Sequence, residues 1–389
     1  MHQPNGKIWL GRRGTHWNHS HCGADSICAL ADYWGFSHCG FRAVHRDFRR
    51  GIRRRVGFDH RRSRVGIIDW PYGLSSGKNC PALITANTAP PTSAANMNDN
   101  ECVQFLQWAL PQLHMRWPGF RKVRAQVCKR IDRRLRQLAI EDIHTYKTYL
   151  HEHKLEWRVL DELCRITISR FYRDKAMFGF LTEHVLPTLA KNALMHHDNR
   201  LNAWSAGCAS GEEAYTVSLI WLLRLQASFA DLNIAITATD ASDQMIARAQ
   251  RACYAYSSIK SLPPQWREQA FRQQQCRTLP LPAQQFPTHQ ESYYLKPEFR
   301  QSVQFMRQDI RRQTPNARFD LVLCRNLVFT YFDIPLQCRV LEHIQQILKP
   351  GGALVIGIHE NLPPGTAQFS VWSERLKVFK KTVNPHSRI

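Results

Sequence analysis

Residues 204–213 read Trp204-Ser205-Ala206-Gly207-Cys208-Ala209-Ser210-Gly211-Glu212-Glu213, and this stretch decides the fold. The apolar run 201–204 leads into two glycines, and a helical pattern over 213–225 follows them. A strand, a glycine turn and a helix in this order form the first unit of an open α/β sheet, in which ligands lie beyond the carboxyl ends of the strands. We therefore expect a ligand against this turn.

Strands and helices continue to alternate towards the end of the chain. Apolar runs predict strands at 234–239, 319–324 and 353–357. Helical patterns cover 243–252 and a segment through Leu341 and Ile347 that stops at 349–352. Near-continuous apolar strands separated by helices indicate a Rossmann-like, mostly parallel α/β sheet covered on both faces. The last two segments, 369–372 and 376–380, are expected to form a hairpin at its edge.

Three further segments complete the predicted domain organisation. Residues 1–96 show no sustained period, and we expect a disordered leader or a start-site artefact with Met97 as the natural first residue. Residues 97–165 are predicted to form a small helical domain, and 166–389 to form the α/β domain. The Gln-, Pro- and Arg-rich segment at about 263–305 interrupts that domain, and it is predicted to be a small insertion.

The helical domain contains a strongly basic segment. Apolar residues recur at three- and four-residue steps from Phe120 to Leu138, which predicts one amphipathic helix. Its other positions are cationic: Lys122, Arg124, Lys129, Arg130, Arg133 and Arg134. Such a face is either a solvated helix surface or a docking surface for an acidic partner. Two more helices are expected at about 141–153 and 155–165.

Composition excludes several classes of protein. The formal charge of +22 would attract nucleic acid, but the basic residues are spread along the chain. No stretch approaches the roughly 20 apolar residues of a spanning helix, and no secretory signal is present, so we expect a cytoplasmic protein without membrane insertion. The 12 Cys residues form no Cys-x-x-Cys pair, and most are predicted to be reduced. We expect no metal site, because His16, His19, His21 and Cys22 fall in an erratic His-rich tract.

Acidic residues near the glycine turn indicate the class of ligand. Glu213 begins the helix after the turn, and Asp240 ends the next strand, where a carboxylate can accept hydrogen bonds from ribose hydroxyls. The chain lacks the Gly-x-Gly-x-x-Gly motif that binds the pyrophosphate of a dinucleotide. A cofactor with a ribose and an adenine but no phosphate remains, which indicates S-adenosylmethionine.

Several ordered motifs resemble one enzyme family over about residues 119–362. They are Ile166-Thr167-Ile168-Ser169-Arg170-Phe171-Tyr172-Arg173-Asp174, the 204–213 turn with Tyr215, Ala238-Thr239-Asp240, Cys324-Arg325-Asn326 with Tyr331-Phe332-Asp333, and Gly357-Ile358-His359-Glu360. These motifs are similar to those of the CheR-type protein-glutamate O-methyltransferases, which methylate chemotaxis receptors. The resemblance implies a class I methyltransferase fold with a mostly parallel seven-stranded sheet. It also implies S-adenosylmethionine as cofactor and glutamate methyl esters as product.

The resemblance also implies the cofactor-binding residues. Thr167, Ser169 and Arg173 would approach the methionine end of the cofactor. Glu213 would hold its amino group, Asp240 its ribose, and Gly207 and Gly211 would form the turn beneath it. Asp309 and Ile310 stand where the family has an Asn-Leu pair beside adenine.

Arg325, Asn326 and Tyr331 would line the opening where the methyl acceptor enters. Arg173, Arg325 and Tyr331 are therefore expected to orient the acceptor carboxylate, without an acid–base role. The chain departs from the family pattern at Tyr172, which replaces Phe, and by one extra residue between Asn326 and Tyr331.

The implied partner is a protein with acidic side chains, such as the cytoplasmic domain of a chemoreceptor, and the enzyme is expected to be a monomer. The main alternative is a CheR-like methyltransferase that acts on a nucleic acid or a small molecule. A nucleic-acid substrate is disfavoured, because the strand that ends at Cys324 lacks an Asn/Asp-Pro-Pro-Tyr motif. A non-catalytic scaffold is the third interpretation.

Overall fold

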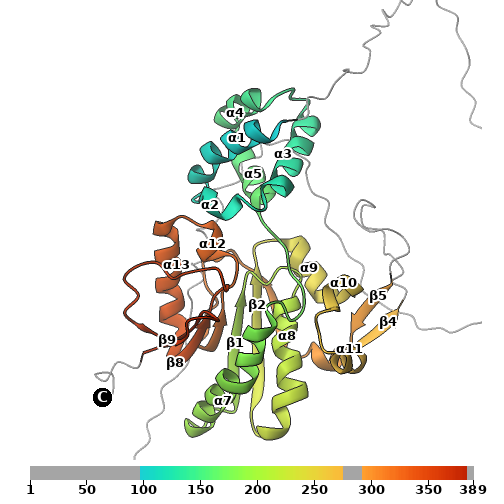
Figure 1. Ribbon diagram of the computed structural model, residues 1–389, viewed down its shortest axis with the longest axis vertical. Coiled ribbons are helices and arrows are strands. Elements are labelled where there is room, and N and C mark those ends of the chain that lie inside the picture. Colours follow the sequence, from blue (N-terminus) through green and yellow to red (C-terminus); the bar gives the residue numbers. More distant parts are fainter. Residues whose placement is uncertain (1–96, 275–290, 383–389) are drawn as a thin grey trace, which may run out of the picture. The chain divides into compact units, whose positions relative to one another are not determined.

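The computed structural model describes residues 97–274 and 291–382 (Figure 1). The predictions for the leader 1–96, including its His-rich tract, lie outside these residues. Within the described part of the chain, no helix is both long enough and apolar enough to cross a membrane.

A seven-stranded sheet forms the centre of the α/β domain, and its strand order is β6-β2-β1-β7-β8-β10-β9. The first five strands in this order are parallel to one another, and the last two pair antiparallel. Their bounds are β1(Arg200–Ala206), β2(Asn233–Asp240), β6(Val303–Arg307), β7(Phe319–Leu323), β8(Leu348–Val355), β9(Phe369–Ser373) and β10(Val378–Lys381). The mostly parallel seven-stranded sheet and its terminal hairpin are thus confirmed. The predicted stop at 349–352 lies inside β8, where the pairing with β7 shifts register.

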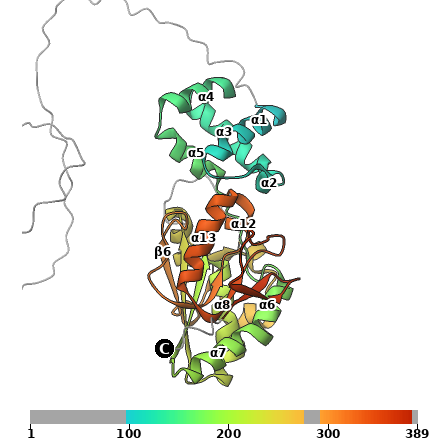
Figure 2. The same ribbon diagram turned by 90° about the vertical axis from the view of Figure 1, so that its left-hand side faces the viewer.

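Helices pack on both faces of this sheet. Because successive side chains of a strand point to opposite faces, Leu321 and Leu323 join one buried apolar cluster and Val322 joins another. The first cluster is covered by α6(Lys175–Phe180), η1(Leu181–Val185), α7(Leu186–Met195) and α8(Glu212–Ile220), which continues through η2(Trp221–Leu225) and η3(Gln226–Ser228). The second is covered by α12(Val328–Tyr331) and α13(Ile334–Ile347) (Figures 1 and 2), and buried residues of the helical domain belong to the same cluster. Helix α9(Asp243–Arg251) lies beside β2 and β6.

The helical domain consists of α1(Asp99–Gln112), α2(Trp117–Phe120), α3(Arg124–Leu138), α4(Ile143–Glu152) and α5(Glu156–Cys164). The single helix predicted from Phe120 to Leu138 is wrong at its start, because the chain turns between α2 and α3. Segment 116–120 instead packs on α12. The Arg116 N–H donates to the Tyr331 carbonyl (2.8 Å), and a Cβ at Gly119 would lie 2.3 Å from the Thr330 oxygen. This tertiary contact outweighs the helical periodicity.

Three of the six predicted cationic residues make hydrogen bonds or ion pairs with other groups of this chain. Arg124 pairs with Asp99 (2.8 Å), and Arg134 pairs with the buried Glu156 (2.7 Å). Arg130 donates to the Leu163 and Arg165 carbonyls at the end of α5. The other three, Lys122, Lys129 and Arg133, are exposed and have no hydrogen-bond or ion-pair partner among the described residues.

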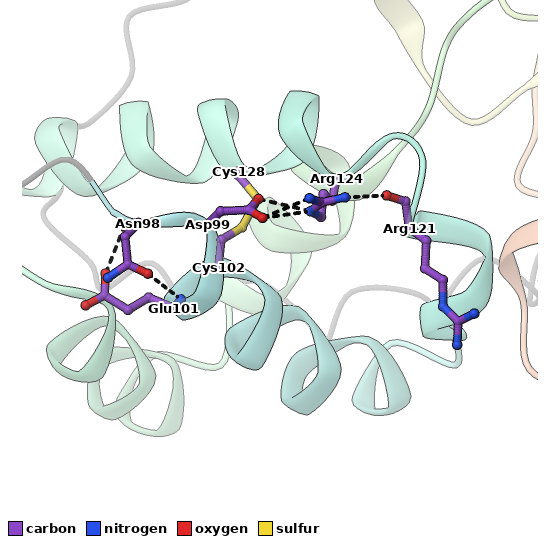
Figure 3. Close-up of a disulfide and its surroundings, with 7 residues drawn as sticks. All are labelled: Asn98, Asp99, Glu101, Cys102, Arg121, Arg124 and Cys128. Carbon is purple, nitrogen blue, oxygen red and sulfur yellow. Dashed lines mark hydrogen bonds and ion pairs between the residues drawn. A yellow bond between two sulfur atoms is a disulfide. The ribbon is translucent and has the colours of Figure 1, made fainter.

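A disulfide joins α1 to α3 (Figure 3). It links the fully buried Cys102 to Cys128, with 5.9 Å between the Cα atoms. Most cysteines were predicted to be reduced, and this pair is an exception, whereas Cys164, Cys208 and Cys324 are free and buried. Near the disulfide, the side chains of Asn98 and Glu101 each accept a hydrogen bond from the other's backbone N–H and so cap the start of α1. Asp99 accepts hydrogen bonds from the Arg124 guanidinium.

Reduction of this disulfide is expected to lower the free energy of unfolding by about 3 kcal/mol. The disulfide closes a loop in the unfolded chain and lowers its conformational entropy, and reduction restores that entropy and so favours unfolding. Urea unfolding with and without a reducing agent measures the effect. Cys128→Ala should show the same loss and no further response to the reductant, whereas Cys338→Ala, which removes a free cysteine of α13, should keep the full response. Equal stability of the oxidised and reduced wild type would contradict the prediction.

A small second sheet forms the insertion, with strand order β3-β5-β4. It comprises β3(Cys253–Ala255), α10(Tyr256–Ile259), α11(Pro264–Ala270), β4(Phe271–Gln274), β5(Ser292–Leu295) and η4(Pro297–Phe299). The sheet thus begins before the predicted boundary at 263. The predicted end at 305 falls inside β6, which belongs to the main sheet.

Candidate active site

A pocket lies at the carboxyl ends of β1, β2, β6 and β7, where the strand–turn–helix pattern predicts a ligand. It encloses about 1090 Å³ of empty space, including solvent at its mouth. Met115, Phe120 and Cys164 of the helical domain complete its wall. The pocket is therefore built jointly by the α/β domain and by the helices that precede it.

Eleven of the twelve predicted site residues line this pocket: Thr167, Ser169, Arg173, Gly207, Glu213, Asp240, Asp309, Ile310, Arg325, Asn326 and Tyr331. Gly211 does not. It lies at the start of α8 with a φ of +89°, and a Cβ there would lie 2.9 Å from Ala249 and Phe305. Gly211 thus allows α8 to pack closely, and it does not contact the pocket.

The turn after β1 packs closely against the Leu327 side chain, which also lines the pocket. Gly207 has a φ of +72°, and a Cβ at this position would lie 2.4 Å from the Leu327 side chain. The N–H groups of Gly207 and Cys208 both donate to the Thr239 carbonyl (2.8 and 2.9 Å). These contacts fix the turn beside the end of β2, where a side chain at position 207 would intrude.

Asp240 is held by backbone donors at this edge. Its carboxylate accepts the Ala209 N–H (3.0 Å) and the Ser242 N–H (2.9 Å). Burial raises the pKa of Asp240, although these two hydrogen bonds act in the opposite direction. Two donors leave about half of the acceptor sites of a carboxylate unused. Asp240 can therefore accept two further hydrogen bonds, as the hydroxyls of a ribose would require.

Glu213 and Arg325 form a buried ion pair. The Arg325 Nη1 donates to Glu213 (2.8 Å), and its Nη2 donates to Asp174. Ser205 donates to the other Glu213 oxygen (2.8 Å), and the guanidinium carbon lies 5.4 Å from the centre of the Phe178 ring. The Arg325 side chain is only 2% exposed. Two carboxylates thus offset the charge of Arg325, while its buried Nε has no hydrogen-bond partner among the described residues.

Arg173 differs from Arg325, because it has no carboxylate partner among the described residues. It donates to the Ile168 carbonyl (3.1 Å) and lies 3.5 Å from the Asn326 amide oxygen. Tyr331 lines the same pocket, and burial raises its pKa, so its phenol remains a neutral hydrogen-bond donor. Unlike Arg325, Arg173 is therefore available to bind an anionic group.

Glu360 supports this side of the pocket from behind. Its carboxylate accepts hydrogen bonds from the Asn326 N–H (2.9 Å) and the Thr330 hydroxyl (2.5 Å). These two bonds fix both ends of the segment 326–330, which contains the extra residue relative to the family pattern. Asn326 adopts a left-handed φ of +55°. The family motif suggested Glu360, but no pattern indicated what it would contact. Asp174 lies in the 166–174 motif, but its contact with Arg325 was likewise not indicated, and Phe178, Arg165 and Arg311 lie outside the motifs.

The side chains of the pocket fit S-adenosylmethionine. Glu213, Asp240 and Asp309 offer three acidic groups for an amine, a ribose and an adenine amino group. The missing side chain at Gly207 lets the turn pack directly against Leu327 at the edge of this pocket. The pocket thus holds suitable partners for the amine, the ribose and the adenine of the cofactor.

Known proteins match this part of the chain. Residues 167–378 match the family described as CheR methyltransferase, SAM binding domain. A Rhodobacter capsulatus protein described as an uncharacterized 104.1 kDa protein in the hypE 3' region is 30% identical over 254 residues, which are 65% of this chain and 25% of that protein. A probable chemotaxis protein methyltransferase of Rhizobium etli is 28% identical over 195 residues, covering 50% of this chain and 67% of the relative.

The chemotaxis protein methyltransferase of Salmonella typhimurium is 26% identical over 262 residues, or 66% of this chain and 83% of the relative. This chain thus spans most of the Salmonella protein but only a quarter of the Rhodobacter one. The family match covers more than half of the chain and contains the pocket residues from Thr167 to Tyr331. The chain belongs to the CheR methyltransferase family and carries its S-adenosylmethionine-binding domain.

Proposed function

We propose that this protein transfers a methyl group from S-adenosylmethionine to the side-chain carboxylate of glutamate residues in an acidic protein partner. The observation that carries the proposal is the contrast between Arg325 and Arg173, two of the arginines that line the pocket. Arg325 is neutralised by Glu213 and Asp174, whereas Arg173 is free to bind an anion. A single cationic contact can orient a carboxylate without strongly reducing its nucleophilicity.

Within this proposal, the cofactor lies along the strand ends. Glu213 holds its amino group, and Asp240 binds the ribose. Asp309 and the Ile310 backbone contact the adenine. Thr167, Ser169 and Arg173 lie at the methionine end. These assignments are supported by the common pocket that the residues line.

When bound, S-adenosylmethionine would supply a methyl group on a positively charged sulfur for transfer to the glutamate oxygen, and the sulfur would keep the electron pair of the broken methyl–sulfur bond. A glutamate side chain is already ionised at neutral pH, since its ordinary pKa is about 4.3, so the chain needs no general base. The Tyr331 phenol and Arg173 align the carboxylate, and Phe120, Phe178 and Met115 exclude water from the pocket wall.

The proposed partner is the cytoplasmic domain of a chemoreceptor, and we place the reaction in the cytoplasm with the enzyme as a monomer. The relatives described as chemotaxis protein methyltransferases support this choice. Lys129 and Arg133 lie one turn apart on α3 and are exposed, so they are available to bind an acidic surface.

Charge reversal at both positions, Lys129→Glu with Arg133→Glu, should lower kcat/KM for a purified chemoreceptor cytoplasmic fragment about tenfold at low salt, and the difference should shrink at high salt. Lys191→Glu with Arg375→Glu makes the same charge change at exposed sites elsewhere and should have little effect. Affinity for S-adenosylhomocysteine should be unchanged in both variants. An equal loss in the two double variants would contradict docking through α3.

The direct test incubates the protein with methyl-tritiated S-adenosylmethionine and the same chemoreceptor fragment. The proposal expects label in protein that is released by mild base, together with methyl-glutamate in the digested fragment by mass spectrometry. Label in RNA or DNA from a cell extract, with none in protein, would favour the nucleic-acid alternative and overturn the proposed acceptor.

A further inference from the structure

Arg311 lies between two carboxylates at the wall of the cofactor pocket. Its Nη1 and Nη2 donate to the two oxygens of Asp161 (2.6 and 2.8 Å). On its other edge, Nε lies 3.0 and 3.1 Å from the two oxygens of Asp309, and Nη2 lies 2.7 Å from one of them. One planar guanidinium thus makes a two-pronged contact with each carboxylate.

The two carboxylates belong to different parts of the protein. Asp161 is a buried residue of α5 in the helical domain, whereas Asp309 follows β6. Asp161 also pairs with Arg165 (3.0 Å), and Arg165 donates to the Ala241 carbonyl just after β2 (3.2 Å). These ion pairs connect α5 to two of the strand ends that form the pocket.

Counting hydrogens shows that Asp309 retains one acceptor site. It receives three hydrogens, from the Arg311 Nε, the Arg311 Nη2 and the Arg311 backbone N–H (3.0 Å). A carboxylate has about four acceptor sites, so one remains for a further donor. Burial raises the pKa of Asp309, but the Arg311 contacts outweigh burial and hold that pKa below its usual range. Asp309 therefore remains ionised at neutral pH and can only accept.

We infer that Arg311 is a positioning residue for cofactor recognition: it holds Asp309 so that the remaining carboxylate site accepts the adenine amino group. The inference rests on the proposed contact between Asp309 and adenine. Only arginine can bridge both carboxylates in this way, because lysine offers a single point charge in place of a planar set of donors. The same guanidinium fastens α5, so the helical domain helps to shape the adenine site.

A pair of ligands separates this role from a merely structural one. S-adenosylhomocysteine carries the adenine amino group, whereas S-inosylhomocysteine has a carbonyl oxygen in its place. The wild type should bind the first at least about tenfold more tightly in a calorimetric titration, because a site that binds a donor rejects an analogue without it. In Arg311→Lys this ratio should fall towards one, mainly through weaker binding of S-adenosylhomocysteine.

Arg312→Ala is the matched control, since Arg312 is the adjacent exposed arginine, and its ratio should equal that of the wild type. Asp161→Asn weakens the anchor of Arg311 and should reduce the ratio in the same direction. If Arg311→Lys weakens both ligands equally, or leaves the ratio unchanged, Arg311 does not position Asp309 and the inference is wrong.

Asp309→Ala distinguishes this failure from failure of the proposed adenine contact. A ratio near one in Asp309→Ala with an unchanged ratio in Arg311→Lys would remove only the role of Arg311. An unchanged ratio in Asp309→Ala would show that Asp309 does not contact the amino group, and both statements would fall. Thermal unfolding of each variant without ligand confirms that binding is measured on folded protein.

Discussion

Arg325→Met is expected to lower the free energy of unfolding by about 3–5 kcal/mol and to abolish measurable binding of S-adenosylhomocysteine. The substitution leaves the carboxylates of Glu213 and Asp174 facing each other at the pocket wall without the cation that neutralises them. Arg325 is almost fully buried, so water cannot replace it. Urea unfolding and calorimetric titration measure the two effects.

Arg318, at the other end of β7, provides the control for Arg325. Arg318 immediately precedes β7 and is exposed, whereas Arg325 follows the same strand and is buried. Arg318→Met should therefore change the unfolding free energy by less than about 0.5 kcal/mol. Adding Glu213→Gln and Asp174→Asn to Arg325→Met should restore much of the stability, because no uncompensated charge then remains buried. A single variant as stable as the wild type would contradict the role of these ion pairs.

Patterns close together in the chain predicted the fold and the cofactor edge well. The apolar runs located β1, β2, β7 and β8, because buried parallel strands show up as continuous hydrophobic segments. Gly207, Glu213 and Asp240 could be placed at the ligand because each lies within a few residues of a strand end. Motif resemblance added Arg173 and Tyr331, which lie in the same pocket.

Features that depend on distant partners could not be predicted. Arg325 was expected to face the acceptor, but its partners lie 112 and 151 positions away in the sequence. Arg311 and Asp161 are 150 positions apart, and neither belongs to a recognised motif. The turn between α2 and α3 likewise depends on contact with α12, which overrides the local helical periodicity. No cysteine spacing indicated that Cys102 and Cys128 would meet.

Asp240→Ala is expected to weaken S-adenosylhomocysteine binding about 100-fold, because it removes the acceptor proposed for both ribose hydroxyls, and hydrogen bonds to charged groups contribute about 1.5–3 kcal/mol each. Calorimetric titration at fixed ionic strength measures the change. Asp243→Ala serves as the control: this residue lies three positions later in α9, is exposed, and pairs only with Arg307 among the described residues. Its affinity should match the wild type, and unchanged affinity in Asp240→Ala would contradict the ribose role.

The pH dependence of binding tests the same carboxylate without removing it. Burial raises the pKa of Asp240 in the free protein, partly opposed by the Ser242 and Ala209 N–H groups. The charged acceptor is thus fully present above this raised pKa, and affinity should fall as the pH is lowered through it, earlier than for an ordinary aspartate. Asp309 should contribute only at lower pH, because burial raises its pKa but the stronger effect of Arg311 lowers it. In Asp240→Asn the fall in affinity on acidification should therefore begin at a lower pH than in the wild type. If the fall begins at the same pH in both, another group causes it, and the titration does not support the proposed contact between Asp240 and the ribose.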